Sequence, residues 1–101
     1  MLALSAAWSV QAADTKENWE KNCAKCHGPD GKAATAMGKK LEVRDLTDAK
    51  VQATFTDAQA TTAIKDGVKA DGKTKMPAYA EKLSDEEIKA LVGYVRSLKK
   101  G

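Results

Sequence analysis

Apolar residues near the C-terminal end of the chain recur every three or four positions, which is the spacing of an amphipathic helix. These residues are Ile88, Leu91, Val92, Val95 and Leu98. Ser84 stands at the N-cap position and Glu87 follows three residues later, which together make a capping box. Leu83 and Ile88 are placed to pack together as a hydrophobic staple. The pattern predicts a helix that begins after Ser84.

Two further helices are predicted from the same kind of signal. Thr56 and Gln59 form a second possible capping box, and the helix that follows is expected to end at Gly67. Near the start of the chain, a helix is predicted to begin at Asp14, to carry Trp19 toward the core and to run into the cysteines at positions 23 and 26. A shorter helical piece is predicted at residues 47–53.

The stretches between these helices are predicted to be irregular. Residues 28–46 and 67–83 contain glycine and proline, and no convincing period-two pattern of a β-strand appears. Residues 28–31, with the sequence GPDG, fit a type I turn with Pro29 in its second position. Long loops in a small domain are either disordered or wrapped around something. We therefore predict an all-α fold of three to five short helices with long loops.

The first thirteen residues differ from the rest because they carry no charge. The segment is apolar and then turns small, with Val10 and Ala12 at the spacing that a signal peptidase accepts. We interpret residues 1–12 as the remainder of a secretory signal and residues 13–101 as the mature domain, in the periplasm or an equivalent lumenal compartment. The alternative is an ordinary disordered N-terminus.

Composition indicates that this domain needs something besides its side chains to hold it together. The chain has 101 residues, and aromatic residues make up only 5% of them, which limits the apolar material for a core. A disulfide between two cysteines three positions apart would constrain little of the unfolded chain, so a bound group is the better candidate. The net charge of +3 includes no long run of like charges, and no nucleic-acid partner is expected.

Both cysteines and the only histidine lie within five consecutive positions. Cys23, Cys26 and His27 form the C-x-x-C-H pattern, which is typical of covalent attachment of c-type haem. Residues three apart on a helix share one face, so both thiols reach one porphyrin while the histidine reaches its iron. A zinc site would need carboxylates to complete four ligands, and a redox dithiol would need a strand–helix unit around the motif. Haem is the favoured interpretation.

A second axial ligand of the iron is expected to be a soft or nitrogen donor, and with no other histidine in the chain the methionines are the favoured candidates. Met1 lies in the predicted signal segment, which leaves Met37 and Met76. Pro77 restricts Met76 to an extended backbone and keeps its loop out of helix. Met37 follows His27 by only ten residues and has to round the proximal side first, so we interpret it as core filler.

The C-x-x-C-H motif after a first helix, the Met76–Pro77 pair in a late loop and the final amphipathic helix together resemble a class I c-type cytochrome. The resemblance covers residues 14–101 and is greatest to small soluble mono-haem bacterial members. It implies a cytochrome c fold around one covalently attached haem c, with His27 and Met76 as iron ligands. It implies no catalytic residues and no enzymatic activity.

The resemblance also identifies a helix crossing. Trp19 matches the aromatic residue of the first helix, and Leu91 and Tyr94 match the apolar pair of the last helix, with Gly93 as a small neighbour. The glycine that the family has in the first helix is replaced by Thr15, which implies a looser crossing. The proline whose carbonyl often fixes the ligating histidine has no counterpart after Pro29, so the acceptor for the His27 N–H is left open.

The function implied is that of a soluble electron carrier, which cycles its iron between Fe(II) and Fe(III) and exchanges electrons with exported or membrane-bound redox partners. The alternative is a haem domain of a peroxidase or a ligand-binding sensor with a displaceable Met76. We expect a monomer without stable membrane insertion. Lysines near the two motifs are expected either to ring the haem edge and dock an acidic partner or to be merely solvated; they are Lys25, Lys32, Lys39, Lys40, Lys69, Lys73 and Lys75.

Overall fold

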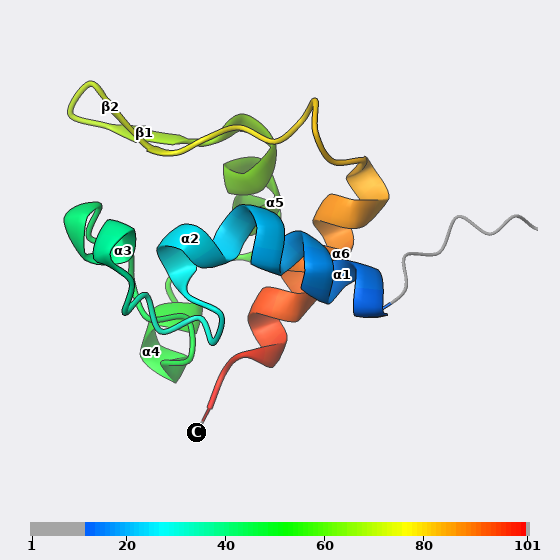
Figure 1. Ribbon diagram of the computed structural model, residues 1–101, viewed down its shortest axis with the longest axis horizontal. Coiled ribbons are helices and arrows are strands. Elements are labelled where there is room, and N and C mark those ends of the chain that lie inside the picture. Colours follow the sequence, from blue (N-terminus) through cyan, green and yellow to red (C-terminus); the bar gives the residue numbers. More distant parts are fainter. Residues whose placement is uncertain (1–11, 101) are drawn as a thin grey trace, which may run out of the picture.

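The computed structural model describes residues 12–100, in which six α-helices, one π turn and a β-hairpin follow one another (Figure 1). The first part contains α1 (Ala12–Asn18), the π turn η1 (Trp19–Cys23), α2 (Ala24–His27), α3 (Ala36–Lys40) and α4 (Ala49–Gln52). The second part contains α5 (Asp57–Asp66), β1 (Val68–Ala70), β2 (Lys73–Met76) and α6 (Asp85–Ser97). The mainly helical architecture agrees with the predicted fold class.

The two predicted capping boxes are confirmed, and they explain where the longest helices begin. The Thr56 hydroxyl accepts from the Gln59 N–H at 3.0 Å, and the Gln59 side chain accepts from the Thr56 N–H at 2.9 Å. The corresponding distances between Ser84 and Glu87 are 3.1 and 2.8 Å. Helix α5 ends as predicted before Gly67, which has a φ of +79°. Helix α4 lies inside the predicted range of residues 47–53.

The start of the first helix was predicted wrongly. Helix α1 already includes Ala12, so Asp14 lies within its first turn and does not cap it. The negative charge of Asp14 is stabilising there because it lies near the positive end of the helix dipole. Apart from Ala12, the predicted signal remnant lies outside the described residues. The boundary between residues 12 and 13 therefore stays a prediction.

The absence of strands was also predicted wrongly, because β1 and β2 form an antiparallel hairpin. Asp71 and Gly72 both have positive φ, at 54° and 74°, which is the requirement of a type I′ turn and the usual reason for an Asp-Gly pair. Five of the seven strand residues are exposed, Lys69 and Lys73 among them, so the strands lack the alternation of buried apolar residues that normally identifies them. The short helix α3 was missed as well.

The core lies where α1 and η1 pack against α6, with α5 on another side of α6. Trp19 is 1% exposed and Leu91 is 0% exposed, and the Trp19 ring lies 5.2 Å from that of Tyr94. This arrangement confirms the expected aromatic crossing. Gly93, in contrast, is exposed with open space around it, so it does not provide the close approach. Thr15 is buried in α1, where a glycine was expected from the resemblance.

Arg96 and Gln52 fasten the segment around α4 to α6. The Arg96 guanidinium donates to the carbonyls of Gln52 and Phe55, each at 2.7 Å. The buried Gln52 amide nitrogen donates to the carbonyls of Leu46 and Val95, at 2.7 and 2.8 Å. Because charge-assisted and buried hydrogen bonds are the stronger kinds, they fix the backbone of Leu46 and Phe55, whose side chains matter below.

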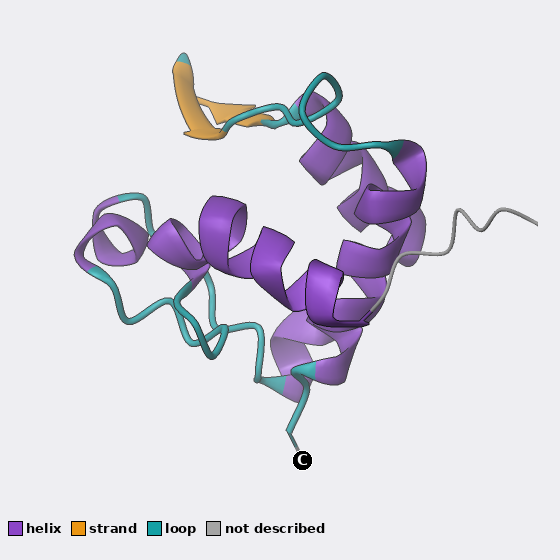
Figure 2. Cartoon of the chain, turned by 45° about the vertical axis from the view of Figure 1, so that its right-hand side comes forward, coloured by secondary structure: helices purple, strands orange, loops and turns teal. Residues whose placement is uncertain are grey.

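The hairpin and α3 extend from the helical core on the same side of the molecule (Figures 1 and 2). Helix α2 lies beside α3 and below the hairpin in Figure 1, and it is continuous with the π turn before it. Within residues 12–100, none of the helices has the length and apolar character required to cross a membrane.

Candidate functional site

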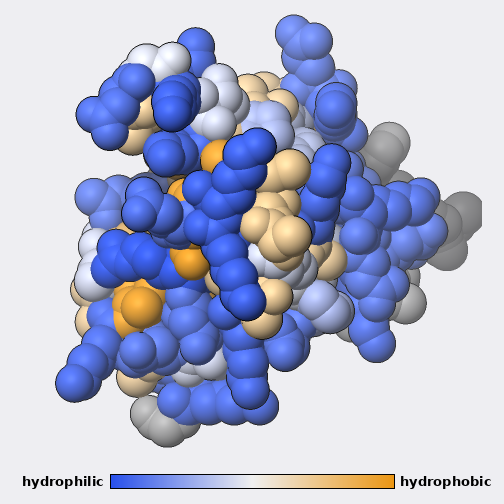
Figure 3. Space-filling model, turned by 60° about the vertical axis from the view of Figure 1, so that its left-hand side comes forward, coloured by the Kyte–Doolittle hydropathy of each residue, from blue (hydrophilic) through white to orange (hydrophobic). Residues whose placement is uncertain are grey.

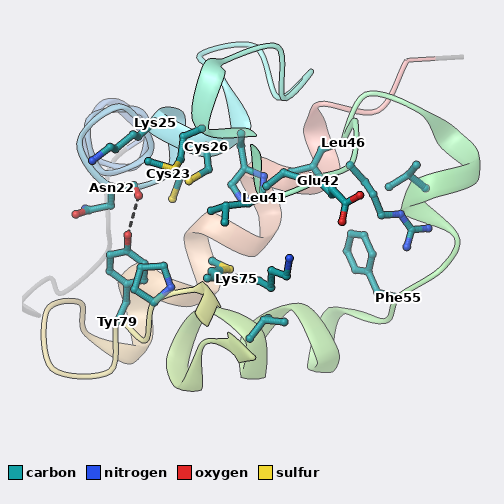
Figure 4. Close-up of a pocket in the computed structure, with 18 of the residues that line it drawn as sticks. Asn22, Cys23, Lys25, Cys26, Leu41, Glu42, Leu46, Phe55, Lys75 and Tyr79 are labelled. Carbon is teal, nitrogen blue, oxygen red and sulfur yellow. Dashed lines mark hydrogen bonds between the residues drawn. The ribbon is translucent and has the colours of Figure 1, made fainter. Parts of the chain in front are cut away.

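A cavity of about 760 Å³ lies between the helical segment that carries the cysteines and the segment that follows β2. In Figure 4, Cys23 and Cys26 lie at one end of this cavity, Tyr79 and Lys75 face it from below, and Phe55 lies at the far end. The molecular face seen in Figure 3 shows apolar surface between long hydrophilic side chains. The cavity is therefore an apolar space with a polar rim.

A smaller space of about 230 Å³ is lined almost entirely by apolar residues. Trp19, Ile64, Leu91 and Val95 contribute to it from the core. Five residues line both spaces: Cys23, His27, Leu46, Phe55 and Met76. The two spaces thus lie around the same side chains, and together they form one site.

Cys23 ends the π turn and Cys26 lies in α2, and both thiols line the larger cavity. Both cysteines are free of disulfide bonds. Burial, and next the proximity of Cys26, raise the pKa of the Cys23 thiol to about 11. Cys23 is therefore a neutral thiol at neutral pH, whereas a reactive redox dithiol needs a cysteine with a lowered pKa.

His27, the last residue of α2, lines both spaces. Burial lowers the pKa of its imidazole, which favours the neutral form that binds metal ions. Its Nδ1 atom is buried and has no hydrogen-bond partner in the structure. The Gly28 carbonyl beside it accepts instead from Trp19 Nε1 at 3.0 Å. In this structure, therefore, no group accepts a hydrogen bond from the His27 Nδ1 atom, and the acceptor that the sequence did not identify is still not identified.

Met76 ends β2 and lines both spaces together with His27, whereas Met37 on α3 lines only the larger one. Met76 also packs against the buried core cluster, as a partly buried residue. The four predicted site residues are therefore brought together around one site. Met37 was interpreted as core filler, but in the structure it lines the larger cavity of this site.

A tight backbone contact holds α3 against the end of the haem-type motif. The Thr35 hydroxyl caps α3 by accepting from the Gly38 N–H at 2.9 Å, and it donates to the Cys26 carbonyl at 3.1 Å. A Cβ on Gly38 would lie 2.3 Å from that carbonyl, so only glycine fits. Neither Thr35 nor Gly38 was predicted to belong to the site, although Thr35 is a suitable N-cap residue for a helix that follows it.

Basic side chains dominate the rim of the larger cavity. Lys21, Lys25, Arg44, Lys75 and Lys82 line it, against Glu42 as the only acid in its lining. Of the seven lysines predicted to ring the site, two are in this set, and the other five do not line the cavity. Lys21 and Lys82 lie within six residues of Cys23 and Met76 but were not predicted to ring the site, whereas Arg44 is distant from both motifs along the chain.

The residues around this site suit a flat apolar group that carries a metal. Two thiols, one unpartnered imidazole nitrogen and two thioethers border a space that is otherwise mainly apolar. In the described part of the chain, no three or more His, Cys, Asp and Glu side chains gather as a metal site, and a structural zinc site uses four such ligands.

Comparison with known proteins identifies the family. Residues 10–95 match the family model described as cytochrome c oxidase, cbb3-type, subunit III. The chain is 36% identical over 96 residues to a cytochrome c-553 of Helicobacter pylori, an alignment that covers 95% of this chain and 90% of that protein. It belongs to the c-type cytochromes.

Two further similarities come from a longer relative and from a solved structure. The chain is 37% identical over 83 residues to the cbb3-type cytochrome c oxidase subunit FixPc of Rhizobium leguminosarum bv. viciae, covering 82% of this chain and 26% of that protein. The solved KustC0563 c-type cytochrome aligns with a TM-score of 0.72 at 36% identity, over 85% of this chain and 98% of that one.

This cytochrome is accordingly an electron-transfer protein, not an enzyme, and its family implies a covalently bound haem c. The electron-carrier class predicted from the sequence is confirmed. Cys23 and Cys26 provide the thiol pair that such attachment requires.

Proposed function

We propose that this cytochrome is an exported one-electron carrier whose haem c is bonded to Cys23 and Cys26 and coordinated by His27 and Met76. The observation that carries the proposal is that these four residues border the same site. When bound, the haem iron supplies the exchange between Fe(II) and Fe(III), and a His/Met ligand pair raises its reduction potential.

The chain's own residues would hold this group and exclude water from it. The two thiols of the π turn and α2 anchor one edge, and the neutral imidazole of His27 offers a nitrogen lone pair. Trp19 and Leu91 close the apolar side, and the Arg96–Gln52 network keeps the wall at Leu46 in place. A rigid, mainly apolar site keeps the rearrangement that accompanies electron transfer small.

We also propose that the basic rim docks an acidic redox partner outside the cytoplasm, where the predicted signal remnant at residues 1–12 would direct the chain. One relative is named as a subunit of a cbb3-type oxidase, which makes a terminal oxidase of that class a suitable partner. Five basic side chains and one acidic side chain line the cavity. A positive patch of this kind accelerates encounter with a negative surface.

The carrier is distinguished from a peroxidase or sensor by whether the iron site is closed. Purified protein should show the weak ferric absorption band near the red end of the spectrum that reports an intact bond between iron and a methionine sulfur. Its ferrous form should not bind carbon monoxide rapidly, because a carrier keeps both axial positions filled. Absence of the band together with fast carbon monoxide binding would contradict the proposal.

The basic rim is tested by reversing charges at two of its lysines. In Lys25→Glu/Lys75→Glu, oxidation of the ferrous protein by anionic ferricyanide should slow by about tenfold at low salt, because steering typically contributes at least this factor. Oxidation by a cationic cobalt complex should become faster. Both differences should fade at about 1 M salt, where the screening length is only about 3 Å. Stopped-flow absorbance measures the rates.

The matched control is Lys16→Glu/Lys89→Glu, which makes the same change in total charge at exposed residues outside the cavity lining. It should alter the ferricyanide rate much less. Equal slowing in the two double variants would mean that only total charge matters and that the rim has no docking role.

A further inference from the structure

The segment that follows Met76 is attached to two different parts of the molecule. Its backbone is bonded to the end of α5: the N–H groups of Tyr79 and Ala80 donate to the carbonyls of Ile64 and Lys65, at 2.9 and 3.2 Å. These are among the last carbonyls of α5, which have no partner within the helix. Residues 77–80 thus close the end of α5 while they continue the chain from Met76.

The Tyr79 side chain makes the second attachment. Its hydroxyl donates to the Asn22 carbonyl at 2.8 Å, across a sequence separation of 57 residues. Asn22 lies in the π turn, directly before Cys23, and π turns are frequently found at functional sites. Tyr79 as a residue is 8% exposed, and it lines the larger cavity (Figure 4). One side chain therefore connects the Met76 segment to the helical segment that carries the cysteines.

The segment that follows Met76 passes so close to the end of α5 that residue 67 has to be glycine. A Cβ on Gly67 would lie 2.5 Å from the Met76 carbonyl oxygen and 3.0 Å from the Ala78 nitrogen. The φ of Gly67 is +79°, a conformation that also favours glycine. The backbone on the α5 side is therefore fixed by close packing and hydrogen bonds, which leaves the Tyr79 hydroxyl as the bond that fixes the other side.

We propose that Tyr79 is a positioning residue that keeps the Met76 segment closed over the site by its hydrogen bond to the Asn22 carbonyl. The inference rests on the proposed coordination by Met76. Without the hydroxyl, residues 77–80 stay bonded to α5 but lose their link to the helical segment of Cys23. Met76 then moves away from the iron more often, although the fold and the attached haem are unchanged.

Tyr79→Phe tests this because it removes one oxygen and keeps the ring. The probe is imidazole, which binds the ferric protein only when the distal ligand has moved away. Stopped-flow spectroscopy should show binding about three- to tenfold faster than in the natural sequence, the range expected for loss of one hydrogen bond. The amide hydrogens of Tyr79 and Ala80 should also exchange with solvent faster, since their segment opens more often.

The matched control is Tyr94→Phe, the same chemical change at the other tyrosine, which packs on Trp19 and does not line the larger cavity. It should bind imidazole at the rate of the natural sequence. If Tyr79→Phe binds no faster than Tyr94→Phe, the positioning role is wrong.

Met76→Ala separates failure of this inference from failure of the proposed coordination. If Met76 is the distal ligand, Met76→Ala binds imidazole fast, and adding Tyr79→Phe to it changes nothing further. Fast binding by Met76→Ala with no effect of Tyr79→Phe alone overturns only the role of Tyr79. If Met76→Ala binds imidazole no faster than the natural sequence, the coordination by Met76 is wrong and the role of Tyr79 falls with it.

Discussion

Replacing Cys23 and Cys26 together by alanine should give a protein without covalently bound haem and without a stable fold. The thiols are the anchoring groups in the C-x-x-C-H motif, and both line the larger cavity. Without the bound group, a cavity of about 760 Å³ stays unfilled in a domain of 101 residues. A domain of this size has little stability to lose, so we expect loss of cooperative thermal unfolding.

Intact mass and a pyridine haemochrome spectrum measure this outcome. The natural protein should carry one haem, show no titratable thiol and begin near Ala13 if the signal interpretation is correct. The single variant Cys23→Ala should retain one thioether bond, and its haemochrome band should shift accordingly. Two titratable thiols in the natural protein, or stoichiometric zinc in place of haem, would contradict the attachment.

Apart from the crossing of Trp19 with Leu91 and Tyr94, which was expected from the family resemblance, the features predicted correctly are those determined by near neighbours in the chain. Capping boxes at Thr56 and Ser84 operate over three residues, and they located the starts of α5 and α6. The spacing of Cys23, Cys26 and His27 is equally local. These signals do not depend on tertiary contacts, so the structure contains the capping boxes where the sequence predicted them.

The features that were missed depend on contacts between distant segments or on weak local signals. The hairpin at residues 68–76 has Asp-Gly turn chemistry, but its strands expose lysines, so the alternation of apolar residues is absent. Tyr79 was missed as a site residue because its partner Asn22 is 57 positions away. Arg44 likewise joins the rim only through folding, because it is distant along the chain from both motifs. Spacing along the chain does not encode such contacts.

The choice between the two methionines rests on how far the chain reaches from His27 and on where the structure places each thioether. Met37 and Met76 both line the larger cavity, so proximity to that cavity does not decide which of the two binds the iron. Only Met76 also lines the smaller apolar space that His27 and Trp19 share. The choice between the two thioethers therefore has to be made by comparing the same substitution at both positions.

Met76→Ala should leave the haem attached but open one coordination position of the iron. The attachment through Cys23, Cys26 and His27 is untouched, so the haemochrome spectrum and intact mass should report full haem content. The ferric band near the red end of the spectrum should disappear, and carbon monoxide should bind the ferrous form quickly. The reduction potential should fall by a sizeable part of the about 0.8 V that axial ligands span, because the thioether favours Fe(II).

Met37→Ala is the matched control, since it makes the same truncation in the lining of the same cavity. It should behave as a packing mutation, with a lower free energy of unfolding and an unchanged ferric band. If the two variants exchange phenotypes, Met37 is the distal ligand and the carrier function is retained. If neither variant alters the spectrum, neither thioether binds the iron. The sixth position is then open or filled by water or lysine, and a closed electron carrier no longer describes this cytochrome.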